Sequence, residues 1–226
     1  MKRLISLLLC VALVLSLGAC TKKPSQTAAQ ETTVPIVTEA PTEAQVSAED
    51  AVGSYENGVY RNEMLGIQAT FDENWYVASV EERLEVVGAV SEAVTDEAIA
   101  DMLENSGTAM DLYAIQASGN NVNLMLQKIN FLQNVLISEQ EYVNQSLPQM
   151  DAAMKSIQVE DAVIEATTIT FAGGEHPAIA ISGTQGGLNF YELMVVVKSG
   201  SYLGIVTAAC YVENTTEEIL GLFEGL

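Results

Sequence analysis

The sequence predicts an α+β domain, in which an antiparallel β-sheet of hairpins and a meander packs against helices. The last third of the chain holds four runs rich in β-branched and aromatic residues, separated by the turns Gly173-Gly174, Gly186-Gly187 and Ser199-Gly200-Ser201. Short turns join antiparallel strands, because parallel strands need a crossover of about a dozen residues or more. Helical periodicity is confined to segments grouped between the strands, which favours α+β over an alternating arrangement.

The first elements of the folded part are a predicted hairpin at residues 58–62 and 65–71, followed by a short strand at residues 75–78. Residues 80–106 lack proline and are rich in Glu, Ala, Val and Leu, which predicts two helices. Thr95 is the expected N-cap of the second helix and Gly107 follows its end. The acidic residues of this stretch predict a solvated outer face.

A second hairpin is predicted at residues 110–117 and 122–130, because Ser118-Gly119-Asn120-Asn121 between them is typical of a tight turn with positive φ. Ser138 and Glu141 then form the pattern of a capping box, which marks the start of a long helix. The apolar residues of this helix recur at steps of three and four, and Pro148 predicts a kink. They are Val143, Leu147, Met150, Met154 and Ile157.

The meander strands are predicted at residues 162–171, 177–184, 188–198 and 202–212. Thr215 and Glu218 form a second capping-box pattern, which predicts a terminal helix. We expect its apolar face to consist of Ile219, Leu220 and Phe223.

The amino terminus has the features of a bacterial lipoprotein signal. Lys2 and Arg3 precede an apolar run at residues 4–17, which is too short to cross a bilayer core of about 30 Å. The sequence Leu17-Gly18-Ala19-Cys20 then resembles a lipobox, in which the cysteine thiol receives a diacylglyceryl group. We therefore expect residues 1–19 to be a signal peptide and Cys20 to carry lipid with acyl chains such as palmitate. The alternative is an ordinary secreted protein in which Cys20 is incidental.

Two further segments follow the signal. Residues 20–55 are rich in Thr, Ala, Gln, Glu and Pro and have few large side chains, which predicts a disordered acidic tether. Residues 56–226 are long enough for one domain with a substantial core. These residues contain five lysines and arginines against 25 aspartates and glutamates, a balance of −20. Nucleic acid is therefore excluded as an expected partner, because phosphate binding needs clustered basic residues.

Few residues have side chains suited to catalysis or metal binding. Cys210 is the only thiol left after Cys10 leaves with the signal and Cys20 is lipidated, and it lies in an apolar run typical of a buried strand. His176 is the only histidine, so no closed zinc site is expected. The pair Glu175-His176 could supply a general base, whereas the simpler interpretation of His176 is a turn residue before Pro177.

Other patterns are weaker. Lys198-Ser199-Gly200 is similar to a strand end of penicillin-recognising enzymes, but no serine has a lysine three residues later. The acidic pairs of the chain lack the spacing of a calcium loop, although weak calcium binding stays open. No nucleotide or hydrolase fingerprint is present, and we expect no cofactor and no metal site.

Four short motifs open the folded part: Gly58-Val59-Tyr60-Arg61-Asn62, Leu65-Gly66-Ile67, Phe71 and Asn74-Trp75. Together they resemble the entry hairpin of PsbP-like domains, and the later order of hairpin, long helix, meander and terminal helix is similar too. The stretch at residues 80–106 resembles an insertion typical of lipoproteins from low-GC Gram-positive bacteria. The resemblance implies a PsbP-like fold and an accessory role with partners, with no catalytic or metal-binding residues.

The expected function is that of a lipid-anchored accessory module on the outer face of the cytoplasmic membrane, in a Gram-positive bacterium. It would bind a protein or envelope component through its sheet or its acidic helical stretch, and would not be an enzyme. The alternative is a hydrolase whose site is assembled from distant residues around Glu175 and His176. Small-solute capture for a transporter is disfavoured, because one such domain lacks the two lobes of hinge-closing binders.

Overall fold

The computed structural model describes residues 46–88, 95–130 and 137–226 of the 226-residue chain. The predicted signal peptide, the lipobox with Cys20 and most of the predicted tether lie outside these residues. Among the described helices, none is long and apolar enough to cross a membrane.

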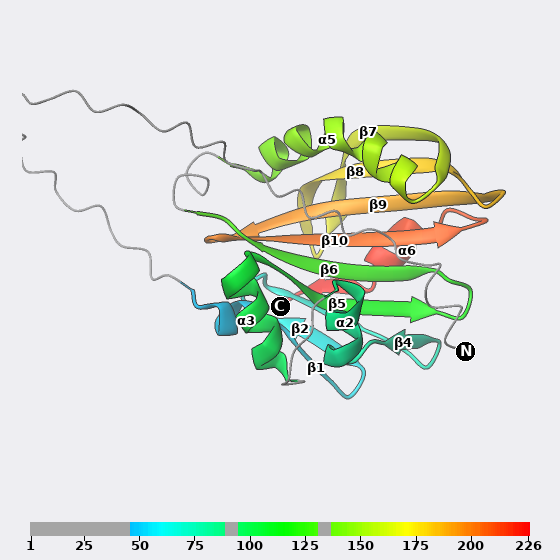
Figure 1. The fold of residues 1–226 in the computed structure, drawn as a ribbon. Helices are drawn as coiled ribbons and strands as arrows, with labels where there is room; N and C mark the ends of the chain where they lie inside the picture. Colours follow the sequence, from blue (N-terminus) through cyan, green and yellow to red (C-terminus); the bar gives the residue numbers. More distant parts are fainter. Residues whose placement is uncertain (1–45, 89–94, 131–136) are drawn as a thin grey trace, which may run out of the picture.

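The larger of two sheets has seven strands, in the order β4-β5-β6-β10-β9-β8-β7 (Figure 1). Each neighbouring pair is antiparallel, so the α+β prediction is confirmed. The strands are β4 (Trp75–Val77), β5 (Thr108–Gln116), β6 (Asn121–Lys128), β7 (Val159–Phe171), β8 (Gly174–Gln185), β9 (Leu188–Ser199) and β10 (Tyr202–Tyr211). The second hairpin is thus β5-β6, and the meander is β7-β8-β9-β10, as predicted.

The smaller sheet has the order β1-β2-β3-β11 and covers one face of the larger one. Its strands are β1 (Ser54–Glu56), β2 (Val59–Asn62), β3 (Ile67–Thr70) and β11 (Phe223–Gly225). Between the sheets lies the first core, in which Tyr60 and Ile67 pack with Leu124, Val195 and Val206. The predicted first hairpin is confirmed as β2-β3.

The helices lie on both sides of the larger sheet. α5 (Glu139–Ser156) packs on β7, β8 and β9 and closes a second core on the opposite face. Val143, Met150 and Met154 of its predicted stripe are buried there. α1 (Ala48–Ala51), α3 (Asp96–Ser106) and α6 (Thr216–Leu220) contribute to the first core, and α2 (Val80–Val86) packs on β5. α5 continues through Pro148, where the sequence predicted a kink.

One prediction of unstructured chain is wrong for the described residues, and one prediction of a solvated face is confirmed. Residues 46–55 were placed in the tether, yet Ala48 and Ala51 of α1 are buried in the first core. The acidic residues at 80–106 were predicted to form a solvated outer face, and Glu81, Glu85 and Asp96 are exposed as predicted. Ile99 and Leu103, on the other side of α3, have no exposed surface. In both segments, small or evenly spaced apolar residues bury one side of a helix and leave the acidic side chains outside.

The ends of the helices differ from prediction in detail. Ser138 accepts a hydrogen bond from the Glu141 amide at 3.1 Å, as predicted. The capping box at Thr215 is wrong, because its side chain makes no cap hydrogen bond and Asn214 Oδ1 accepts the Thr216 amide instead. Phe223 belongs to β11, opposite Ala69 of β3, rather than to the terminal helix.

Candidate functional site

The predicted pair Glu175-His176 does not form a pair in the structure. His176 lies within β8, opposite Ile169 of β7, so its interpretation as a turn residue is also wrong. The Glu175 carboxylate accepts a hydrogen bond from Thr170 Oγ1 at 2.6 Å. His176 Nδ1 lies 3.2 Å from Oε2 of Glu139, the first residue of α5. Successive strand residues face opposite sides of a sheet, which separates the two predicted partners.

Glu139 and His176 meet where the larger sheet opens. Pairing of β8 with β9 ends at Ala178 and Val195, whereas β8 stays paired with β7 as far as Gly174. The Glu139 carboxylate lies in this opening, since its Oε1 accepts the Lys198 amide of β9 at 2.7 Å. Glu139 therefore fastens the start of α5 to two diverging strands, and the sequence could not reveal this because its partners are 37 and 59 residues away.

An imidazole beside a carboxylate can act as a general base when it reaches a nucleophile. The side chain of His176 is 20% exposed and its ring lies edge-on to Phe171. Among the described residues, Glu139 is the only side chain to which His176 hydrogen bonds. The contact between Glu139 and His176 has the geometry of an anchored strand end. Among the described residues, no hydroxyl or thiol is placed to act as a nucleophile with His176.

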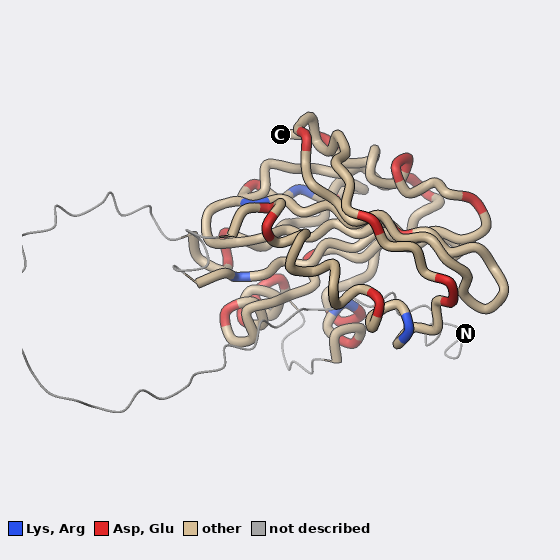
Figure 2. Tube along the Cα trace, turned by 90° about the horizontal axis from the view of Figure 1, so that it is seen from above, with Lys and Arg blue, Asp and Glu red and all other residues tan. Residues whose placement is uncertain are grey.

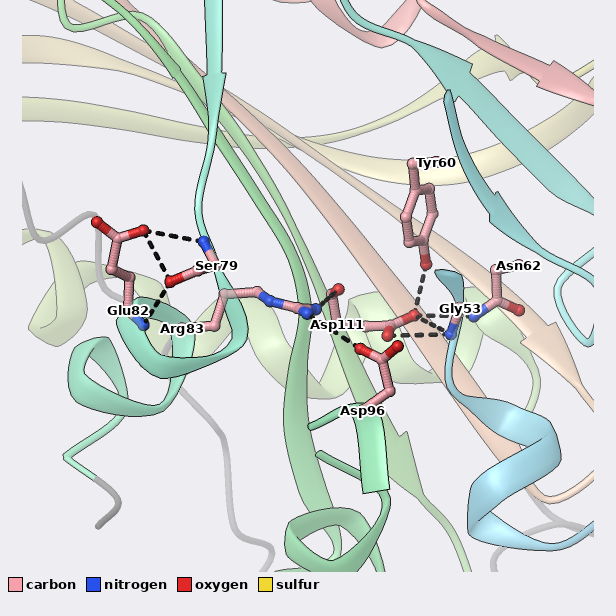
Figure 3. A network of polar contacts seen from close by, with 8 residues as sticks. All are labelled: Gly53, Tyr60, Asn62, Ser79, Glu82, Arg83, Asp96 and Asp111. Atoms are coloured by element: carbon pink, nitrogen blue, oxygen red, sulfur yellow. Dashed lines mark hydrogen bonds and ion pairs between the residues drawn. The ribbon is translucent and has the colours of Figure 1, made fainter. Parts of the chain in front are cut away.

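A second polar cluster is built around Asp111 of β5, which is 1% exposed (Figure 3). Its carboxylate accepts hydrogen bonds from the Gly53 amide at 2.9 and 3.0 Å, from Tyr60 Oη at 2.5 Å and from Asn62 Nδ2 at 2.9 Å. These donors come from the segment after α1 and from β2. The Asp111 carboxylate therefore joins the smaller sheet to the larger one.

Arg83 of α2 extends the Asp111 cluster on its other side (Figure 3). Its guanidinium donates to the Asp111 carbonyl oxygen and lies 3.6 Å from the Asp96 carboxylate of α3. Burial raises the pKa of Asp111 despite its hydrogen bonds with Tyr60, Gly53 and Asn62, and burial beside Asp111 raises the pKa of Tyr60 well above its usual value. The cluster holds two helices and both sheets together, and we assign it a structural role.

A third polar group lies on the α5 side of the larger sheet. Asn123 of β6, Thr207 of β10 and Glu192 of β9 alternate with residues of the second core, and each is at least 93% buried. Burial alone raises the pKa of Glu192 to about 7. Buried polar groups normally have partners, and this group has none among the described residues.

Charge is distributed over the surface rather than gathered at one point (Figure 2). Acidic residues lie on many loops and helices of the described chain, and basic residues are few. Lys128 and Lys155 each pair with a carboxylate, Glu104 at 2.6 Å and Asp151 at 2.5 Å. The described residues contain no group of three or more His, Cys, Asp and Glu side chains arranged for a metal ion.

Strand β7 forms one edge of the larger sheet and pairs only with β8 among the described residues. Its 13 residues carry three acidic side chains, Glu160, Asp161 and Glu165, and neither lysine nor arginine. The stretch from Glu165 to Thr168 is exposed at every position. The free edge therefore presents unpaired backbone groups to solvent beside negative charge.

Cys210 has no exposed surface, which confirms the predicted buried thiol. Its Sγ accepts a hydrogen bond from the Thr215 amide at 3.3 Å, so the thiol helps to place the start of α6.

Comparison with known proteins found no matching family model and no matching curated protein. Solved structures that are similar include cyanobacterial PsbP from Synechocystis, with 12% identity and a TM-score of 0.44, over 85% of this chain and all of that one. LpqN of Mycobacterium tuberculosis, described as involved in cell envelope biogenesis, has 10% identity and a TM-score of 0.35, over 69% of this chain and 75% of that one. A protein from Bacteroides thetaiotaomicron has 8% identity and a TM-score of 0.38, over 71% and 45%. At these identities, neither function nor partners follow from the similarities.

Proposed function

We propose that the chain is a lipid-anchored, extracytoplasmic accessory protein, and that its acidic domain binds a protein partner without catalysis. The free edge of β7 is the observation that carries the binding role. An edge strand pairs readily with another extended chain, because its outward N–H and C=O groups lack partners. Most proteins protect such an edge with lysine, proline or a covering element, and between Glu165 and Thr168 β7 has none of these.

The partner we propose is an extended segment that contains lysine or arginine. Backbone hydrogen bonds would add it to the sheet beside β7, and the carboxylates of Glu160, Asp161 and Glu165 would attract its basic side chains. A second copy of this chain fits less well, since it would bring an equally acidic strand against β7.

Membrane attachment is tested by replacing Cys20 with alanine. We expect nearly all of the protein to move from the detergent-extractable membrane fraction to the soluble fraction, because stable anchoring needs the two acyl chains on that cysteine. The matched control is Cys10→Ala, which alters a cysteine inside the predicted signal peptide and should leave fractionation unchanged. Equal membrane retention of Cys20→Ala and the unaltered protein would refute the anchor.

The binding role is tested by Glu165→Lys, which reverses the charge at the exposed part of β7. We expect recovery of a crosslinked partner from membranes to fall at least tenfold, because the lysine repels a basic segment and the change lies at the proposed contact. The matched control Glu218→Lys makes the same charge change on the exposed side of α6 and should retain recovery. Equal losses in the two variants would show that general charge, not the β7 edge, governs binding.

A further inference from the structure

The polar group on the α5 side of the larger sheet lies among strongly apolar neighbours. On the same face, β9 contributes Phe190, Met194 and Val196 and β10 contributes Leu203 and Ile205, all of the second core. Asn123, Thr207 and Glu192 interrupt this face at exposures of 3%, 7% and 3%. A sheet face of this kind has no need of polar residues for packing, and burying them without partners is costly.

The three side chains lack partners among the residues that the structure describes. Within the described residues, none of them forms a hydrogen bond or an ion pair, in contrast to the carboxylate of Asp111 with its donors from Gly53, Tyr60 and Asn62. A buried carboxyl group with neither donor nor counter-charge is among the most expensive groups to maintain in a fold. None of their polar atoms is among the described atoms that are both fully enclosed and without a partner, so a small guest or water can reach them.

Strand register places the three groups within reach of one small guest. Thr207 is directly opposite Asn123, and Glu192 is opposite Ala209, two residues further along β10. Directly opposite Cβ atoms on neighbouring strands lie about 4.5–5.5 Å apart, and diagonal neighbours about 7–8 Å.

We propose that this place binds a primary ammonium group, with Glu192 as its counter-ion and Thr207 and Asn123 as further acceptors. An ammonium carries three N–H donors, and the carboxylate, the Thr207 hydroxyl oxygen and the Asn123 amide oxygen are three acceptors. The contact between the ammonium group and the Glu192 carboxylate would be a buried, charge-assisted hydrogen bond, which is stronger than a hydrogen bond between neutral groups.

Other guests fit less well. Calcium takes six to eight oxygen ligands, usually with several carboxylates, and this face offers one carboxylate. An anion would be repelled by Glu192. Water alone could satisfy the three groups, and that outcome is separated from ammonium binding by the experiment below.

The test measures the melting temperature of the lipidated protein, as extracted from membranes into detergent micelles, at pH 8. Methylammonium chloride and tetramethylammonium chloride are each added at 100 mM and compared with sodium chloride. Tetramethylammonium has the same charge but no N–H donor, so it reports general attraction to an acidic protein. We expect methylammonium to raise the melting temperature by about 3–6 °C over sodium chloride, as for a ligand with a Kd of about 10 mM, and tetramethylammonium to raise it by less than about 1 °C.

Glu192→Gln should abolish the difference in melting temperature between the two ammonium salts. Thr207→Val, which keeps the shape of the side chain, should reduce this difference. Glu165→Gln, at an exposed glutamate of β7, should keep the full difference. Equal shifts with both salts, or an undiminished difference in Glu192→Gln and Thr207→Val, would overturn the proposal in favour of surface attraction or water alone. Parallel arms with putrescine, glucosamine and alanine separate a polyamine, an amino sugar and an amino acid as the source of the ammonium.

Discussion

Replacing Asp111 by alanine is expected to lower the free energy of unfolding by about 3–5 kcal/mol. The alanine variant leaves the Gly53 amide, the Tyr60 hydroxyl and the Asn62 amide buried without their acceptor. Each unsatisfied buried donor costs about 1–3 kcal/mol, and the losses are coupled because all three donors share one carboxylate. Urea unfolding followed by the fluorescence of Trp75 measures the change.

Two comparisons make the Asp111 result specific. Asp101→Ala removes an exposed carboxylate of α3 and should change stability by less than about 0.5 kcal/mol. Asp111→Asn keeps one acceptor oxygen and should lie between the alanine variant and the unaltered protein. A loss below about 1 kcal/mol for Asp111→Ala would mean that the cluster does not hold the two sheets together.

Glu192→Gln is expected to stabilise the protein by about 3 kcal/mol at pH 8 and to have little effect at pH 4.5. Burial raises the pKa of Glu192 to about 7, from an ordinary value of 4.5. The folded state therefore binds more protons than the unfolded state between these two values. The contribution of Glu192 to the free energy of unfolding is fully present below about pH 4.5. It falls as the pH rises through 7 and is then constant. Glutamine cannot ionise, so the variant avoids this loss.

Chemical unfolding at a series of pH values from 4.5 to 8.5 gives the measurement. Burial also raises the pKa of Asp111, so some decline with pH should persist in Glu192→Gln. Glu165→Gln on the exposed β7 edge should show the same pH slope as the unaltered protein. Parallel pH slopes for Glu192→Gln and the unaltered protein would indicate that Glu192 titrates normally in the fold. The comparison is made without added amines, since an ammonium guest would lower the pKa of Glu192.

The fold was predictable where its signals are local. The turns Gly173-Gly174 and Gly186-Gly187 and the runs between them contain everything needed to identify the meander. The second hairpin follows in the same way from Ser118-Gly119-Asn120-Asn121. Alternation, turn composition and helix caps act over a few residues, so one sequence suffices to detect them.

Other elements depend on distant partners. β11 has only three residues, and its strand character comes from pairing with β3 more than 150 positions earlier. α1 has four residues, and its place is set by the burial of Ala48 and Ala51 against the first core. Neither element has a periodic pattern long enough to stand out from a linker.

The buried polar clusters could be predicted only in part from the sequence. Asp111 and Glu192 are each the only acidic residue of an otherwise largely apolar strand, which is a sequence signal of a buried carboxyl group. The contact of His176 with Glu139 gave no such signal, because the opening between β8 and β9 that brings them together is a property of the sheet. Adjacency in sequence favoured Glu175, and the alternation of strand side chains excluded it.

The proposed role of the domain rests on its free β7 edge, and site-specific photo-crosslinking in intact cells tests it most directly. A photo-reactive amino acid is placed at Thr167 on β7 and, as a control, at Glu218 on α6, and crosslinked peptides are sequenced by mass spectrometry. We predict adducts from Thr167 to one protein, at an extended segment containing lysine or arginine, and none above background from Glu218. Absence of Thr167 adducts, equal yields from the two positions, or adducts to a second copy of this chain would contradict the proposal.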